Sequence, residues 1–153
     1  MAKAFSLQPL LHLAQQHHDT ATRKLGQLNR NQQAAQGKLE MLQQYRRDYQ
    51  DKLQHAEKSG LQLQDLRNFQ DFIYRLDDAI VQQSAVVVQA QESVAQGRNE
   101  LLETQRRMKS FDTLANRHHE VEKKRTAKIE QQMQDEHSGR RVAYKNIELN
   151  EEN

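Results

Sequence analysis

The chain has 153 residues, of which 35% are hydrophobic and 29% are charged, and its formal net charge at pH 7 is only +2. So small a hydrophobic share excludes a thick globular core, but a two-helix coiled coil needs only a narrow apolar seam. Disorder is disfavoured because the net charge is small and helix-forming residues dominate. The chain has no cysteine, which excludes disulfides, and no apolar run long enough to span a membrane.

The first half of the chain carries a coiled-coil pattern. Positions at alternating intervals of four and three residues from Leu7 to Ala56 are mostly apolar, which is the heptad spacing of a helix with one packed face. Ser6 is a suitable N-cap, and Pro9 falls in the first turn, where its missing N–H costs little. Polar residues occupy the seam at His18, Gln32 and Arg46. Such residues weaken a seam but can fix its register.

A second heptad series runs from Leu66 to Ala115. Between the two series, Gly60 follows a basic last turn, which is typical of a helix end. Two amphipathic helices of equal reach with a short connection fold back on each other. The sequence therefore predicts an all-α fold, a long antiparallel two-helix coiled-coil hairpin. Its turn lies near Ser59-Gln64, and Ala56 lies near Leu66.

The predicted chain is a single domain over 1–153. Its predicted elements are helix 1 over about 6–58, a turn over about 59–64, helix 2 over about 65–136 and a flexible tail over about 137–153. His137-Ser138-Gly139 is predicted to end the second helix, since the apolar seam thins beyond Ala115.

Aromatic side chains gather near the predicted turn at positions that the seam does not require. Tyr45 and Phe72 flank the seam on neighbouring helices at a similar height. Tyrosine and phenylalanine supply a large contact area at low entropy cost, so this pair predicts a docking patch for another protein. Alternatively, the rings fold over the seam and widen its core, and both interpretations can hold at once.

Charge is unevenly distributed along the chain. Residues 1–30 sum to +3 and residues 104–128 to +5, whereas residues 31–103 and 129–153 each sum to −3. The two basic stretches share the open end of the predicted hairpin, where their positive charge would attract an acidic surface of a partner protein. A solvated charged face without a partner is the competing interpretation.

Other functional classes find little support in the residues. The basic stretch contains Phe111 as its one aromatic residue and no nucleic-acid-binding motif, so no nucleic acid is expected. Adjacent histidines at His17-His18 and His118-His119 point about 100° apart on a helix, so no metal site is expected. A two-helix seam leaves no room for a catalytic site, a cofactor or a small-molecule substrate. We therefore expect a protein that is not an enzyme.

Two aromatic segments on either side of the predicted turn have a distinctive spacing. Residues 39–49 read LEMLQQYRRDY, and residues 68–80 read NFQDFIYRLDDAI. They resemble the L-x-x-L-x-x-Y-x-x-x-Y and N-[YF]-Q-x-F-I-x-x-L-x-x-A-I stretches of the bacterial flagellar export protein FliJ family. Leu25-Gly26 is similar to the family's early Leu-Gly, and the position of Gly60 and the total length also fit.

The resemblance implies a soluble component of the flagellar type III export apparatus, similar in shape to the central stalk of rotary ATPases. Members of this family place the open end of the hairpin in the pore of the hexameric flagellar export ATPase and promote assembly of its ring. Near the turn they contact the cytoplasmic domain of the membrane export gate. They are also associated with the recycling of export chaperones. The expected location is cytoplasmic, peripherally associated with the cytoplasmic face of the inner membrane.

The family's gate-contact patch corresponds to Leu42, Tyr45, Tyr49, Phe72, Leu76 and Ala79. This sequence departs from the family pattern at Lys38, where an amide is usual, and at Gln83, where a histidine occurs. Charge alone indicates the candidate ATPase contacts, which are Arg106, Arg107, Lys109, Arg117, Lys123 and Lys124. The alternative function is a generic cytoplasmic coiled-coil chaperone or scaffold, including a paralogue from a virulence secretion system.

Overall fold

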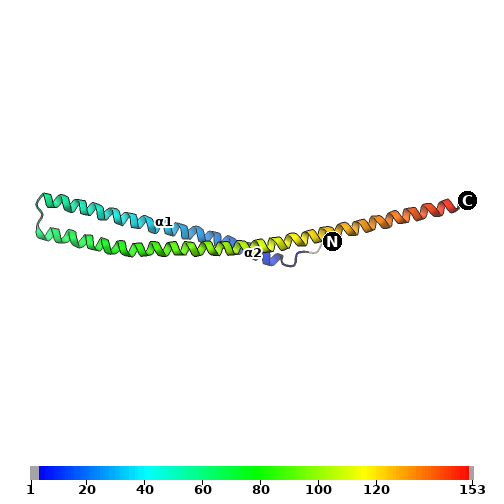
Figure 1. The fold of residues 1–153 in the computed structure, drawn as a ribbon, viewed down its shortest axis with the longest axis horizontal. Coiled ribbons are helices and arrows are strands. Elements are labelled where there is room, and N and C mark those ends of the chain that lie inside the picture. The colour runs from blue at the N-terminus through cyan, green and yellow to red at the C-terminus, as the bar shows by residue number, and fades with distance from the viewer. Residues whose placement is uncertain (1–3, 152–153) are drawn as a thin grey trace. The chain divides into compact units, whose positions relative to one another are not determined.

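The computed structural model describes residues 4–151, which form two long helices, α1 (Gln8–Lys58) and α2 (Leu63–Glu151). The predicted all-α antiparallel coiled-coil hairpin is confirmed, and no strand occurs within these residues. They divide into two compact units. One unit contains the turn and covers 17–105, where Figure 1 shows α1 and α2 side by side. The other combines 4–16 with 106–151.

The turn forms where the sequence predicts it. The amide of Ser59 donates to the carbonyl of Ala56 over 3.2 Å, and the amide of Gly60 donates to the carbonyl of Glu57 over 3.3 Å. Gly60 has a φ of 85°, a left-handed conformation that glycine adopts without the clash a Cβ would cause. These bonds satisfy carbonyls at the end of α1, and α2 begins at Leu63, two residues earlier than predicted.

In the unit that contains the turn, the heptad prediction is confirmed. Every predicted seam position from 18 to 56 and from 66 to 104 is buried or half-buried. The most buried aliphatic residues are Ala21, Ala35, Leu39, Leu76, Val87 and Val94. Ile80 and Ala90 pack against the cluster of Ala35, Leu39 and Val87. No described side chain is completely buried, because the seam between two helices is only one side chain thick.

Gln83 is a polar residue inside this seam. Its side chain is 7% exposed, and its Nε2 donates to the carbonyl oxygen of Ala35 on α1 over 2.9 Å. A buried amide costs free energy unless it is hydrogen-bonded, and this bond across the two helices meets that need. Gln83 therefore belongs to the core of the hairpin, in agreement with its place in the second heptad series; the family resemblance also puts this position at the edge of the docking patch.

Two polar pairs across the helices confirm the predicted register. A register with Ala56 near Leu66 places position 46 near 76 and position 24 near 98. Arg46 bonds Asp77 through Nε and through Nη2, the latter 3.5 Å from Oδ2, and Lys24 Nζ lies 3.0 Å from Glu100 Oε2. The hydrogen bond and charge of Asp77 raise the pKa of Arg46. The Lys24–Glu100 pair is exposed and the Arg46–Asp77 pair is partly exposed, so both select the antiparallel register more than they add stability.

The other compact unit combines residues 4–16 with 106–151. Leu11 and Ala14 are each 6% exposed, and the ring of Phe5 lies 5.5 Å from the ring of His118. From Lys123 onward, every described residue of α2 is exposed. Within residues 4–151, no second helix packs on this part of α2.

The predicted end of the second helix near Glu136 is wrong, because α2 passes through His137-Ser138-Gly139 and continues to Glu151. A single internal glycine costs about 1 kcal/mol, and the residues after Gly139 are mostly good helix formers without proline. The residues of the predicted tail that follow Glu151 lie outside the described range. The flexibility of the tail and the single domain both stay predictions.

Candidate protein-binding surfaces

The structure divides the six predicted gate-contact residues into two groups. Leu76 is buried at 7% exposure, and Leu42 and Tyr49 are half-buried in the seam. Tyr45 and Phe72 lie at the surface with 49% and 37% exposure, while Ala79 is half-buried. We call these six residues, all within one compact unit, the aromatic patch. Only its outer members can offer a large contact area to a partner.

The rings of the aromatic patch differ in the contacts that they make. The ring centroid of Phe72 lies 4.2 Å from that of Tyr49, with 31° between the planes. Tyr49 also lies 6.2 Å from Phe69, and Lys52 Nζ lies 5.3 Å from the ring of Tyr49. Phe72 thus folds over the seam and widens its core, as the alternative interpretation proposed. Tyr45 contacts no other ring among residues 4–151 and is 49% exposed, so it is the most available aromatic residue of the patch.

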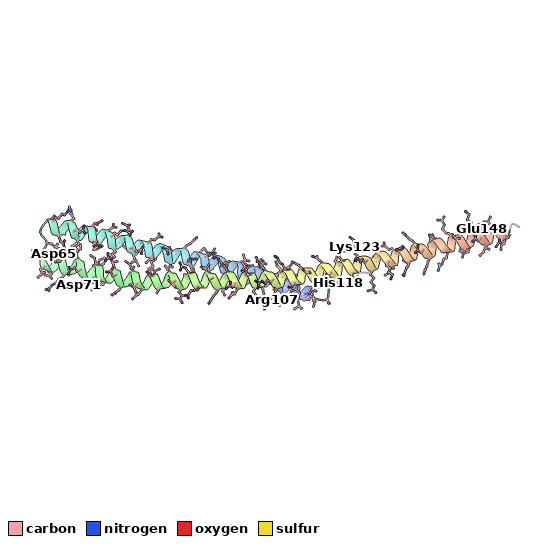
Figure 2. All side chains as sticks on the ribbon, in the orientation of Figure 1. Asp65, Asp71, Arg107, His118, Lys123 and Glu148 are labelled. Carbon is pink, nitrogen blue, oxygen red and sulfur yellow. The ribbon has the colours of Figure 1, made fainter. Side chains whose placement is uncertain are left out.

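An open recess lies next to the aromatic patch, with a volume of about 380 Å³. Its lining residues are Tyr49, Leu61, Asp65, Asn68, Phe69 and Phe72. Figure 2 shows Asp65 and Asp71 on the first turns of α2. The sequence analysis did not name Leu61 or Asp65 as site residues, because neither is aromatic and neither belongs to the two segments that resemble the family. The combination of ring faces and one carboxylate suits a side chain of a partner protein.

The six candidate ATPase contacts all lie on α2 within the other compact unit, and we call them the basic surface. All six are exposed, and none forms an ion pair with any residue between 4 and 151. Their spacing places Arg106, Arg117 and Lys124 on one face of the helix, whereas Arg107 points about 100° away. Figure 2 shows Arg107 and Lys123 along this part of α2. A partner can therefore meet cations on more than one side of the helix.

The described residues provide surfaces rather than a deep cavity. Within 4–151, no three His, Asp or Glu side chains come together as a metal site. No helix over the same residues is long and apolar enough to cross a membrane. The fold and its two surfaces define the class of this protein: an antiparallel coiled-coil hairpin with an aromatic patch near its turn and a basic surface on its longer helix.

Comparisons with known proteins agree with this class. The family model described as "Flagellar FliJ protein" matches residues 3–146. The flagellar FliJ proteins of Salmonella typhi and of Escherichia coli (strain K12) are each 31% identical over 117 residues, which cover 76% of this chain and 80% of each relative. No solved structure matches. The chain belongs to the flagellar FliJ protein family, which confirms the resemblance read from the two aromatic segments.

Proposed function

We propose that this chain is a non-enzymatic, stalk-like component of the flagellar type III protein export apparatus. In this proposal it promotes assembly of the export ATPase ring, links the ring to the membrane export gate, and takes part in handling export chaperones. Membership of the flagellar FliJ family carries the assignment to the flagellum. The architecture supports a linking role, because the aromatic patch and the basic surface lie in different compact units of the chain.

The proposed gate contact rests on the aromatic patch. Tyr45 is 49% exposed at a position that the coiled coil does not need, and Tyr49 and Phe72 form a ring pair beside an open recess. Aromatic residues beside a recess are frequent hot spots of protein interfaces, because they bury much area and lose little entropy. We propose that the cytoplasmic domain of the export gate docks here.

The proposed ATPase contact rests on the basic surface. Its six cations are exposed and have no internal ion pair within residues 4–151, so they can attract an acidic lining of a ring-shaped partner. The corresponding location is the cytoplasm, with peripheral attachment to the inner membrane through the gate.

Replacing Tyr45 with alanine tests the gate contact. We expect Tyr45→Ala to weaken binding to the isolated cytoplasmic domain of the export gate about tenfold or more, because a hot-spot ring is lost. Helix content and unfolding should stay unchanged, because the ring is half exposed and lies outside the seam. Titration calorimetry measures the affinity, and circular dichroism monitors the helices.

The matched control for this test is Tyr74→Ala, which removes a tyrosine with 66% exposure on α2. It should leave gate binding within twofold of the wild type. Equal losses in the two variants would argue against a specific patch. If the wild type failed to bind the gate domain at all, the generic coiled-coil scaffold would become the better explanation.

Reversing charge on the basic surface tests the ATPase contact. The triple variant Arg106→Glu/Arg107→Glu/Lys109→Glu should weaken co-sedimentation with the assembled ATPase about tenfold or more at low salt. The wild-type interaction should itself weaken as salt rises, since exposed charges are screened.

A control variant with the same change in net charge distinguishes the loss of a local contact from an effect of the overall charge on binding. Arg47→Glu/Arg67→Glu/Arg75→Glu reverses three exposed residues in the unit that contains the turn. It should retain ATPase binding. The proposed contact is wrong if this control loses binding to the same degree as the triple variant.

A further inference from the structure

The exposed C-terminal part of α2 carries a second heptad face that the hairpin does not use. Positions 129, 133, 136, 140, 143 and 147 follow alternating steps of four and three residues, so they lie on one side of the helix within about 80°. Ile129, Met133 and Ile147 on this face are 49%, 66% and 55% exposed. A heptad face on a helix with no neighbour is suited to a partner helix of matching pattern.

The residues on this face are symmetric about Ser138. At equal distances on either side stand Ile129 and Ile147, Met133 and Ala143, and Glu136 and Arg140. When two identical helices cross antiparallel with their two-fold axis at Ser138, each apolar residue meets an apolar one and each Glu136 meets an Arg140. We propose that this chain forms an antiparallel homodimer through residues 125–151 of α2.

The residues beside the seam show the same complementarity. In the proposed pairing, Lys128 of one copy lies opposite Glu148 of the other, and Asp135 lies opposite Arg141. Two-fold symmetry repeats each contact, so each pair of oppositely charged residues in the sequence forms two ion pairs in the dimer. All four side chains are exposed in the structure, and none is in an ion pair within residues 4–151.

Other self-pairings of this face are disfavoured. A parallel pair sets Glu136 against Glu136 and Arg140 against Arg140 at the seam, which is repulsive. An antiparallel pair shifted by one heptad sets Ile129 against Arg140, or Glu136 against Ile147, and so buries a charge on an apolar residue. Charged seam residues thus fix both orientation and register, as polar seam positions do in other coiled coils.

The overlap is modest in size. Residues 125–151 span on the order of 40 Å at about 1.5 Å rise per residue, and few of the seam residues are large and apolar. Charged residues in the middle of a seam lower its stability while they specify its partner. The dimer is therefore expected to dissociate reversibly on dilution.

Sedimentation of the full chain against concentration tests the proposal. The apparent mass should rise from 18.0 kDa toward twice that value. Glu136→Arg and Arg140→Glu should each weaken dimerisation about tenfold or more, because each reverses two symmetry-related pairs. The double variant Glu136→Arg/Arg140→Glu should restore the dimer, because the charges again match across the axis. Arg98→Glu, an exposed change in the other unit, should leave the dimer unaffected.

Cysteine cross-linking tests the orientation, since the native chain has no cysteine. A mixture of Met133→Cys chains with Ala143→Cys chains should yield the mixed disulfide dimer, whereas Met133→Cys alone should not cross-link. Helix content by circular dichroism shows whether each variant is folded. A wild-type chain that remains monomeric at all concentrations overturns the proposal. Cross-linking of Met133→Cys alone, or failure of the double charge swap to restore the dimer, also overturns it.

Discussion

Leu39→Ala is expected to lower the free energy of unfolding by about 2–3 kcal/mol. Leu39 is 9% exposed and belongs to the cluster with Ala35 and Val87, against which Ile80 and Ala90 pack. The loss combines the burial free energy of the deleted methyl groups with the cost of a cavity that two helices alone cannot refill. The expected cost lies toward the lower end of the range for Leu→Ala substitutions, because the seam is thin and most of its side chains are partly exposed to solvent. Urea denaturation followed by circular dichroism of the helices measures the change.

The same substitution outside the seam is the control for Leu39. Leu102→Ala removes a leucine with 51% exposure from α2, in the same compact unit. It should change the free energy of unfolding by less than about 0.5 kcal/mol, because little buried contact is lost. Similar effects of the two variants would mean that Leu39 does not occupy the core of the hairpin.

Gly97→Leu is expected to lower the free energy of unfolding by about 1–3 kcal/mol, even though leucine is the better helix former. A Cβ at position 97 would lie 2.8 Å from Leu28 Cδ1 and 3.4 Å from Leu25 Cδ1, both on the facing helix. The larger side chain would have to push the helices apart at this point. The Gly97→Ala change should cost much less, because the flexible end of Leu28 can shift and the helix gains about 1 kcal/mol in propensity.

Gly37→Leu provides the opposite expectation with the same chemical change. A Cβ at position 37 meets nothing within 4 Å, so only helix propensity is altered. The free energy of unfolding should rise by up to about 1 kcal/mol. Thermal melting of both variants under identical conditions checks the pair. If Gly97→Leu also raised the stability, the close approach of the helices at Gly97 would be disproved.

The candidate site was only partly predictable from sequence. The aromatic segments drew attention to the turn end of the hairpin, since Tyr45 and Phe72 lie off the heptad seam. Sequence could not tell that Phe72 lies against the ring of Tyr49, while Tyr45 contacts no other ring among residues 4–151. Tyr45 and Phe72 occupy the same heptad position on their helices. Which of the two rings packs over the seam depends on side-chain rotamers and on the space beside each ring. The docking role of the six patch residues stays a proposal.

The end of α2 was the one element boundary that sequence placed badly. The predicted stop at His137-Ser138-Gly139 relied on one glycine and on a thinning apolar seam. Helix propensity of the following residues outweighs that signal, and α2 reaches Glu151. The misjudged stretch contains the second half of the symmetric face on which the proposed dimer rests, and the two halves form one face only because the helix passes through Ser138.

The sequence by itself determined the two helices, their turn and their register. The helices follow from heptad periodicity, the turn from Gly60, which is free to adopt a φ of 85°, and the register from two heptad series of equal length. All three are local or repetitive properties of the sequence. Only the tertiary structure decided how individual side chains share the seam. It placed the Gln83 amide on the Ala35 carbonyl and brought Leu28 against Gly97, because such contacts depend on the separation and rotation of two helices far apart in sequence.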